Sequence, residues 1–141
     1  MEKDINYYTF AENDYQFLKA NIDQNRVGNA MASIAQNTCE RYLKHLVETY
    51  CTETDCTAIL KTHSLKRILR FLEDQLKDFS VSKDKIILAD GYYFSARYPG
   101  DESFFVNEED VKICWNAVQE TKNAVDVYLE NHKKKAGSIL E

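Results

Sequence analysis

The sequence NAMASIAQNTCERYLKHLVETY, residues 29–50, contains neither proline nor glycine and repeats its apolar residues every three or four positions. This spacing is typical of one face of an α-helix and not of a strand. We expect a helix from Val27 or Asn29 to Tyr50. Its apolar residues form a broad stripe that indicates burial against other elements: Val27, Met31, Ile34, Ala35, Thr38, Tyr42, Leu46 and Tyr50.

Four further segments have the same helical periodicity. Thr9 and Glu12 have the spacing of a capping box, which indicates the start of a helix that ends near Asn25. Residues 52–61 are the expected connection between the second and third helices. The other three helices are expected over 62–79, 82–93 and 107–135, each after a polar N-cap residue: Thr62, Ser82 and Asn107.

Five amphipathic helices with short links predict an all-α fold, an antiparallel up-and-down bundle of four to five helices. A chain of 141 residues has the length of one domain with a sizeable core. We expect a single helical domain over residues 1–135 and a disordered tail over residues 136–141.

The composition excludes several classes of protein. No run reaches the roughly 18 apolar residues that a membrane helix needs, and the N-terminus lacks the apolar core of a signal peptide. We therefore expect a cytoplasmic protein with no membrane partner and with reduced cysteines. The spacing of Cys39, Cys51, Cys56 and Cys114 lacks the close pairs of a zinc site, so we expect no metal. Nor do we expect a cofactor.

Charge is unevenly distributed along the chain. The formal net charge of −5 argues against indiscriminate nucleic-acid binding. Residues 61–70 nevertheless contain four basic residues and no acid, whereas residues 101–110 contain five acids and no base. This polarity is compatible with self-association or with a partner, and equally with two solvated faces.

Two groups of polar residues are candidates for chemistry. Gln36, Glu40 and Lys44 are four apart and share one stripe of the helix over 29–50, where a solvated or interface-facing role is the simplest interpretation. Arg97 comes just before Pro99, the only proline of the chain, where the helical pattern stops. An arginine at such a break either complements the end of a helix dipole or binds an anion.

Three short motifs then occur in order: QNTCERYLK over 36–44, THSL over 62–65 and ARYP over 96–99, with a last amphipathic helix after them. This succession resembles the HEPN family of small helical bundles, named for supposed nucleotide binding, from about Glu12 to Tyr128. The resemblance implies a bundle that typically forms a dimer. Many members are metal-independent ribonucleases in which an arginine, four to six intervening residues and a histidine form the site. Others act beside a small nucleotidyltransferase, often as a toxin–antitoxin pair.

The chain departs from the ribonuclease pattern, because the residues after Arg97 include Asp101 and Glu102 but no histidine at a permitted position. The resemblance therefore implies a non-catalytic homodimer that binds a nucleotide or RNA, or a nucleotidyltransferase partner. The ligand-binding residues expected on this basis are Arg97, Lys44, His63 and Tyr98, and no catalytic residue is assigned. A divergent ribonuclease that pairs Arg97 with a histidine from elsewhere, such as His63, is the alternative. A third hypothesis is a purely structural protein whose function is the dimer or the partner complex itself.

Overall fold

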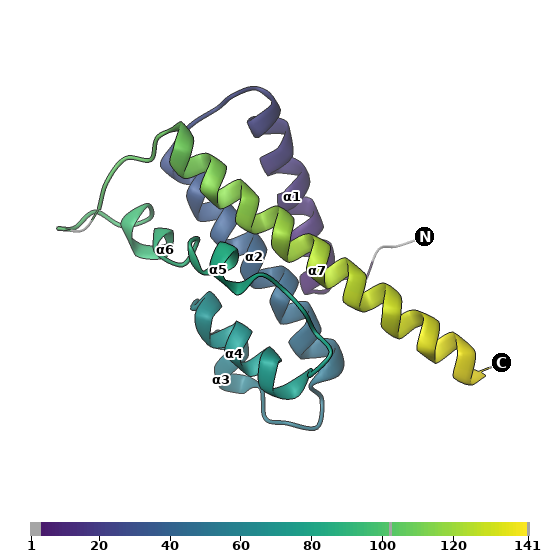
Figure 1. The fold of residues 1–141 in the computed structure, drawn as a ribbon. Helices are drawn as coiled ribbons and strands as arrows, with labels where there is room; N and C mark the ends of the chain where they lie inside the picture. Colours follow the sequence, from purple (N-terminus) through teal and green to yellow (C-terminus); the bar gives the residue numbers. More distant parts are fainter. Residues whose placement is uncertain (1–3, 102, 141) are drawn as a thin grey trace.

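The computed structural model describes residues 4–101 and 103–140, and within these ranges the chain forms helices and no strand (Figure 1). The predicted all-α bundle is confirmed. The described helices are α1 (Tyr7–Asp23), α2 (Asn29–Tyr50), α3 (Thr57–Lys61), α4 (Leu65–Gln75), α5 (Lys83–Ile87), α6 (Tyr92–Ser95) and α7 (Glu108–Leu140).

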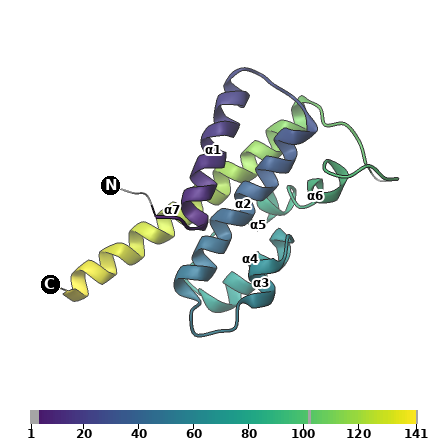
Figure 2. The ribbon, with the colours of Figure 1, turned by 180° about the vertical axis from the view of Figure 1, so that it is seen from behind.

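Of the three long helices around the core, α2 and α7 run in the same direction and α1 runs against both (Figures 1 and 2). The backbone N–H of the first α1 residue donates to Glu48, near the end of α2, at 3.0 Å, so α1 and α2 are antiparallel. Helix α7 also runs against α1, because Tyr8 bonds Asp126 whereas Tyr15 stacks on Trp115. Beyond these contacts, the C-terminal part of α7 extends past the other helices.

Helix α2 is the centre of the bundle. It contacts α1, α3, α4, α6 and α7, and most of its expected apolar stripe lies in or against the core. Val27 is the exception, because it precedes the helix and is 43% exposed. Tyr42, Leu43 and Leu46 are fully buried in it. Three of the four cysteines, Cys39, Cys51 and Cys114, are buried, and all four are free thiols. No helix in the described part of the chain is long and apolar enough to cross a membrane.

A polar cluster joins α1, α2 and α7 on the side of the core away from α4. The Nζ of Lys122 donates to Glu12 at 2.6 Å and to Asp126 at 2.9 Å. The hydroxyl of Tyr42 donates to the same Glu12 carboxylate at 2.6 Å, and that of Tyr8 to Asp126 at 2.7 Å. Burial alone would lower the pKa of Lys122, but its two hydrogen bonds raise this pKa above the usual range. Lys122 is therefore a permanent cation that joins two helices.

The first helix begins earlier than predicted, at Tyr7. Its capping box is made by Asn6 and Thr9, and not by Thr9 and Glu12. The Oδ1 of Asn6 accepts the N–H of Thr9 at 2.9 Å, and the Oγ1 of Thr9 accepts the N–H of Asn6 at 3.2 Å. The carboxylate of Glu12 is used by Lys122 instead. Thr9 was therefore correctly identified as a capping residue, but in the wrong position of the motif.

The third predicted helix begins later than expected. The connection over 52–61 contains the short helix α3, and α4 begins after Ser64 rather than after Thr62. Thr62 has an extended backbone, and its Oγ1 accepts the N–H of Ser64 at 3.2 Å. Ser64 is the N-cap, because its hydroxyl accepts the N–H of Arg67 at 3.2 Å.

The fourth predicted helix, over 82–93, is divided into α5 and α6. Between them the N–H groups of Ala89 and Asp90 bond the carbonyls three residues earlier, so the chain tightens into turns. Gly91 lies in this segment, where its low helix propensity favours an interruption. The break also lets the Asp90 side chain reach the start of α4.

The last helix begins as predicted. The Oδ1 of Asn107 accepts the N–H of Asp110 at 2.9 Å, and Asp110 accepts the N–H of Asn107 in return. Helix α7 is described as far as Leu140, and Glu141 lies outside the described residues. The division into a domain over 1–135 and a disordered tail over 136–141 stays a prediction.

The contribution of the Lys122 cluster to the free energy of unfolding can be compared with that of an exposed ion pair whose residues are also four apart. Lys122→Met should lower the free energy of unfolding by about 2 kcal/mol, because it leaves two partly buried carboxylates without their cation. Lys19→Met is the matched control, since Lys19 bonds Asp23 at 3.2 Å with the two side chains 52% and 63% exposed. It should change the free energy by no more than about 0.5 kcal/mol. Urea unfolding measures both, and equal effects would contradict a stabilising role for the cluster.

Candidate functional site

Three separated parts of the sequence meet on one side of α2, and Tyr93 of α6 joins two of them. The guanidinium carbon of Arg97 lies 4.3 Å from the centroid of the Tyr93 ring. The imidazole of His63 stacks on the same ring, with centroids 4.8 Å apart and planes 15° apart. His63 in turn contacts Glu40 of α2. The fold thus brings together one residue or more from each of the motifs at 36–44, 62–65 and 96–99.

Arg97 follows the last turn of α6 and directs its guanidinium onto α2, not onto the carbonyl end of α6. Its Nη2 donates to the Oδ1 of Asn37 at 3.0 Å and to the carbonyl of Ser33 at 3.4 Å. The side chain is partly buried. Among the described residues no carboxylate forms an ion pair with it, and no hydrogen bond to another described residue uses its Nη1 or Nε. Since a guanidinium group always carries its charge, Arg97 is a permanent cation. Its Nη1 and Nε groups can still donate hydrogen bonds to a ligand.

His63 is held from one side and open on the other. Its Nδ1 lies 3.0 Å from the Oε1 of Glu40. A carboxylate only accepts hydrogen bonds, so this contact assigns a proton to Nδ1 and leaves Nε2 for another partner. The His63 side chain is 52% exposed, whereas that of Glu40 is 7% exposed. A buried carboxylate therefore orients an accessible imidazole.

Lys44 is the second partner of the Glu40 carboxylate. Its Nζ donates to Glu40 at 2.5 Å, and its side chain is only 4% exposed. The ion pair expected at this spacing is present, but the prediction of a solvated or interface-facing stripe was wrong, since Gln36, Glu40 and Lys44 are all buried. The ring of Tyr7 in α1 lies 6.0 Å from the Nζ on this side of α2. A buried pair of this kind is costly to break, because either partner alone leaves an uncompensated charge.

The turn that carries His63 is fixed by two further polar side chains. The Nε2 of Gln36 donates to the carbonyl of His63 at 2.7 Å, while the Oε1 of Gln36 is buried with no partner among the described residues. The carboxylate of Asp90 accepts the N–H groups of Leu65 and Lys66 at 2.7 and 2.9 Å. Asp90 thereby caps α4 from the segment before α6. This bond ties the position of Tyr93 to that of His63.

Two grooves belong to this region, one lined by Tyr93 and the other by Arg97. One has a volume of about 630 Å³ and is lined by His63, Tyr93 and Phe94, together with Lys61, Thr62, Ser64, Asp90 and Gly91. The other, of about 320 Å³, contains Arg97 and Tyr98 in its wall, with Asn29 and residues of the segment before α7. Lys44 lines neither groove. Of the four predicted residues, Arg97, His63 and Tyr98 therefore line a groove. Lys44 is buried and is connected to the site only through Glu40.

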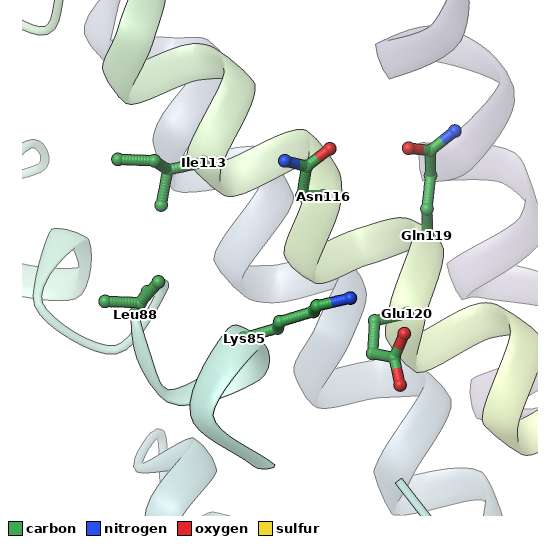
Figure 3. A pocket seen from close by; sticks show the side chains of 6 residues that line it. All are labelled: Lys85, Leu88, Ile113, Asn116, Gln119 and Glu120. Atoms are coloured by element: carbon green, nitrogen blue, oxygen red, sulfur yellow. The ribbon is translucent and has the colours of Figure 1, made fainter. Parts of the chain in front are cut away.

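A third groove, of about 400 Å³, lies between α5 and α7 (Figure 3). Leu88 and Ile113 lie at one end of it, and Lys85 extends toward α7 at the other. None of the residues predicted from the sequence lines it. This groove is separate from the candidate site around Tyr93.

Sequence reasoning missed several residues of the site. Tyr93 was expected only as the last residue of the helix over 82–93, yet its ring contacts both Arg97 and His63. Asn37 and Asp90 were not singled out, and their spacing along the chain carries no signal for contacts 60 and 25 positions away. Glu40 was expected only as a residue of the same helical stripe as Lys44, and its contact with His63 was not predicted. Within the described residues no group of three histidine, cysteine or acidic side chains could hold a metal ion.

The chain matches the model of a known domain family. The model of the HEPN domain matches residues 8–128, which is most of the chain. No curated protein and no solved structure is significantly similar to it. The matched range includes α2, the turn before α4, α6 and most of α7, and so contains Arg97, Tyr93, His63, Glu40 and Lys44. The chain belongs to the HEPN domain family.

Proposed function

We propose that the protein is a non-catalytic, dimeric HEPN protein of the cytoplasm that binds a phosphate group of a nucleotide or of RNA at Arg97. The observation that carries this proposal is the partly buried guanidinium of Arg97, which has no carboxylate partner among the described residues. Two neutral acceptors on α2 and the Tyr93 ring hold it in place. Its remaining donors have the fork geometry that suits a phosphate.

The other predicted residues support the same ligand in different ways. His63 offers an accessible Nε2 on the same Tyr93 ring, and Tyr98 shares the groove of Arg97. Exposed aromatic rings such as Phe94 provide flat surfaces for a base. Lys44 is buried, so we assign it an indirect part, in which it holds the Glu40 carboxylate that orients His63.

The absence of the family's ribonuclease motif supports a binding role rather than catalysis. The next histidine after Arg97 is His132, far beyond the permitted four to six intervening residues. Asp101, which occupies the segment instead, is exposed and would repel a phosphate. Its neighbour Glu102 lies outside the described residues.

A nucleotidyltransferase partner, in a toxin–antitoxin setting, is the second part of the proposal. It rests on the family alone, in which such pairs are frequent. Titration with a purified minimal nucleotidyltransferase encoded beside this gene tests it, and the absence of a complex at micromolar concentrations would remove this part.

Calorimetric titration with ATP and with a short oligoribonucleotide tests the ligand. Wild-type protein should bind one of them, and Arg97→Ala should weaken that binding at least about tenfold, because the charge-assisted bonds to phosphate are lost. Arg70→Ala is the matched control, since Arg70 is exposed on α4 and lines neither groove of the site. It should bind as wild type does. Equal heats for wild type and Arg97→Ala, or no heat with either ligand, would remove Arg97 from a binding role.

A divergent metal-independent ribonuclease is the alternative, and one observation favours it. Glu40 orients His63 through Nδ1, which is the arrangement that prepares an imidazole for proton transfer at Nε2. Arg97 contacts the same Tyr93 ring and could stabilise charge on a phosphate nearby. This version needs RNA to span both grooves.

Incubation with structured RNA in EDTA tests this alternative. If it holds, wild-type protein cleaves the RNA, and His63→Ala lowers the rate at least about a hundredfold, as for the loss of a general acid or base. His132→Ala is the control, because His132 bonds Asp78 elsewhere in the fold. Cleavage that persists in His63→Ala, or that never occurs, eliminates this mechanism.

A further inference from the structure

The side chain of Asn29, the first residue of α2, bonds a distant part of the chain. An asparagine at the start of a helix is preferred as the N-cap, where it accepts an N–H of its own helix. The N-cap of α2 is Gly28, and the Asn29 amide instead reaches the segment before α7. Its Nδ2 donates to the Phe104 carbonyl at 2.9 Å, and its Oδ1 accepts the Val106 N–H at 2.8 Å. One side chain thus holds one stretch of backbone, residues 104–106, which we call the wall segment.

Few other contacts attach the wall segment to the fold. One further described hydrogen bond joins it to another element, from the Phe104 N–H to the Ser95 carbonyl at 3.3 Å. Phe105 is 93% exposed, whereas Val106 is buried. A connection between helices with so few attachments depends on each of them for its position. We therefore expect the Asn29 amide to fix where the wall segment lies.

The wall segment belongs to the groove that contains Arg97. Phe104 and Phe105 line this groove of about 320 Å³, and Asn29 lines it as well. The position of the wall segment relative to the guanidinium therefore determines the width of the groove. It also determines whether a ligand held by Arg97 contacts the wall segment.

Arg97 and the wall segment are attached to the same side of α2. Arg97 bonds the carbonyl of Ser33 and the Oδ1 of Asn37, whereas the wall segment bonds Asn29. These three α2 residues are four apart, so they lie on successive turns. With a rise of about 1.5 Å per residue, Asn29 precedes Ser33 by about 6 Å and Asn37 by about 12 Å along the axis. One helix therefore sets the spacing between the guanidinium and the wall segment.

We propose that Asn29 is a positioning residue for the phosphate site at Arg97, because it holds the wall segment against the start of α2 and so sets the width of the groove. The inference rests on the proposed function and adds a residue that acts through the wall segment. Without the Asn29 amide, the wall segment keeps a single described hydrogen bond to another element. A ligand must then order the wall segment when it binds, which weakens binding although Arg97 keeps its charge and its partners on α2.

Hydrogen exchange on the full chain tests the first half of the proposal. In Asn29→Ala, the amide hydrogens of the wall segment should exchange at least about tenfold faster than in wild type, because the Val106 N–H loses its acceptor. Exchange in the middle of α2 should not become faster, since alanine is a better helix former than asparagine. This comparison separates a local release of the wall segment from a general loss of stability.

Calorimetric titration tests the second half, with ATP or the oligoribonucleotide, whichever wild type binds. Asn29→Ala should bind it about three- to tenfold more weakly. The dependence of that affinity on salt concentration should remain that of wild type, because the charge of Arg97 stays in place. Asn21→Ala is the matched control, since the Asn21 amide donates to the Phe17 carbonyl within α1 and lines neither groove of the site. It should match wild type in both experiments.

Three results would overturn the proposal. They are unchanged exchange of the wall segment in Asn29→Ala, faster exchange with unaltered affinity, and weaker binding without faster exchange, which would make Asn29 a direct ligand contact. Binding that Arg97→Ala weakens and Asn29→Ala does not would keep the proposed function and remove this inference. If wild type binds neither ligand, the phosphate site fails and the positioning role fails with it, whereas the exchange result still shows whether Asn29 holds the wall segment.

Discussion

The carboxylate of Glu40 connects the interior of the bundle to its candidate site. It is almost fully buried in α2, where it accepts a bond from Lys44 and orients His63 through Nδ1. A carboxylate in such surroundings is tolerated only with cationic or donor partners, so the turn that carries His63 must stay packed on α2. The position of His63 relative to Tyr93, and through that ring to Arg97, depends on this contact.

Helix α2 therefore forms the centre of the bundle and also provides the buried partners of the site residues. One side of it packs on α1 and α7, where Lys122 joins two carboxylates and two tyrosines. Its other side bonds Arg97 through Asn37 and the turn before α4 through Gln36. Charged groups inside a small bundle reduce the number of arrangements that satisfy every partner, which favours a single placement of the short helices α3 to α6. The site is packed where it meets α2 and exposed where it meets solvent.

Much of the fold follows from periodicity, whereas the details of the site do not. The repeat of apolar residues over 29–50 was sufficient to predict α2, and the Asn107 cap to predict the start of α7. The short helices were mispredicted, because capping by Ser64 and the break at Asp90 and Gly91 depend on contacts between α4 and the segment before α6. Burial of Lys44 could not be predicted, since a polar stripe on a helix is ordinarily solvated. Arg97 was identified from its place before Pro99, but its partners on α2 are set by tertiary packing.

The geometry at Glu40 requires that this carboxylate hold His63 in one tautomer with Nε2 free. Nitrogen-15 NMR of the histidine side chains, at a pH where His63 is neutral, tests it most directly. We expect a wild-type His63 protonated on Nδ1, and a mixture of tautomers in Glu40→Ala. A wild-type His63 protonated on Nε2, or one that already exchanges between the two forms, would contradict it.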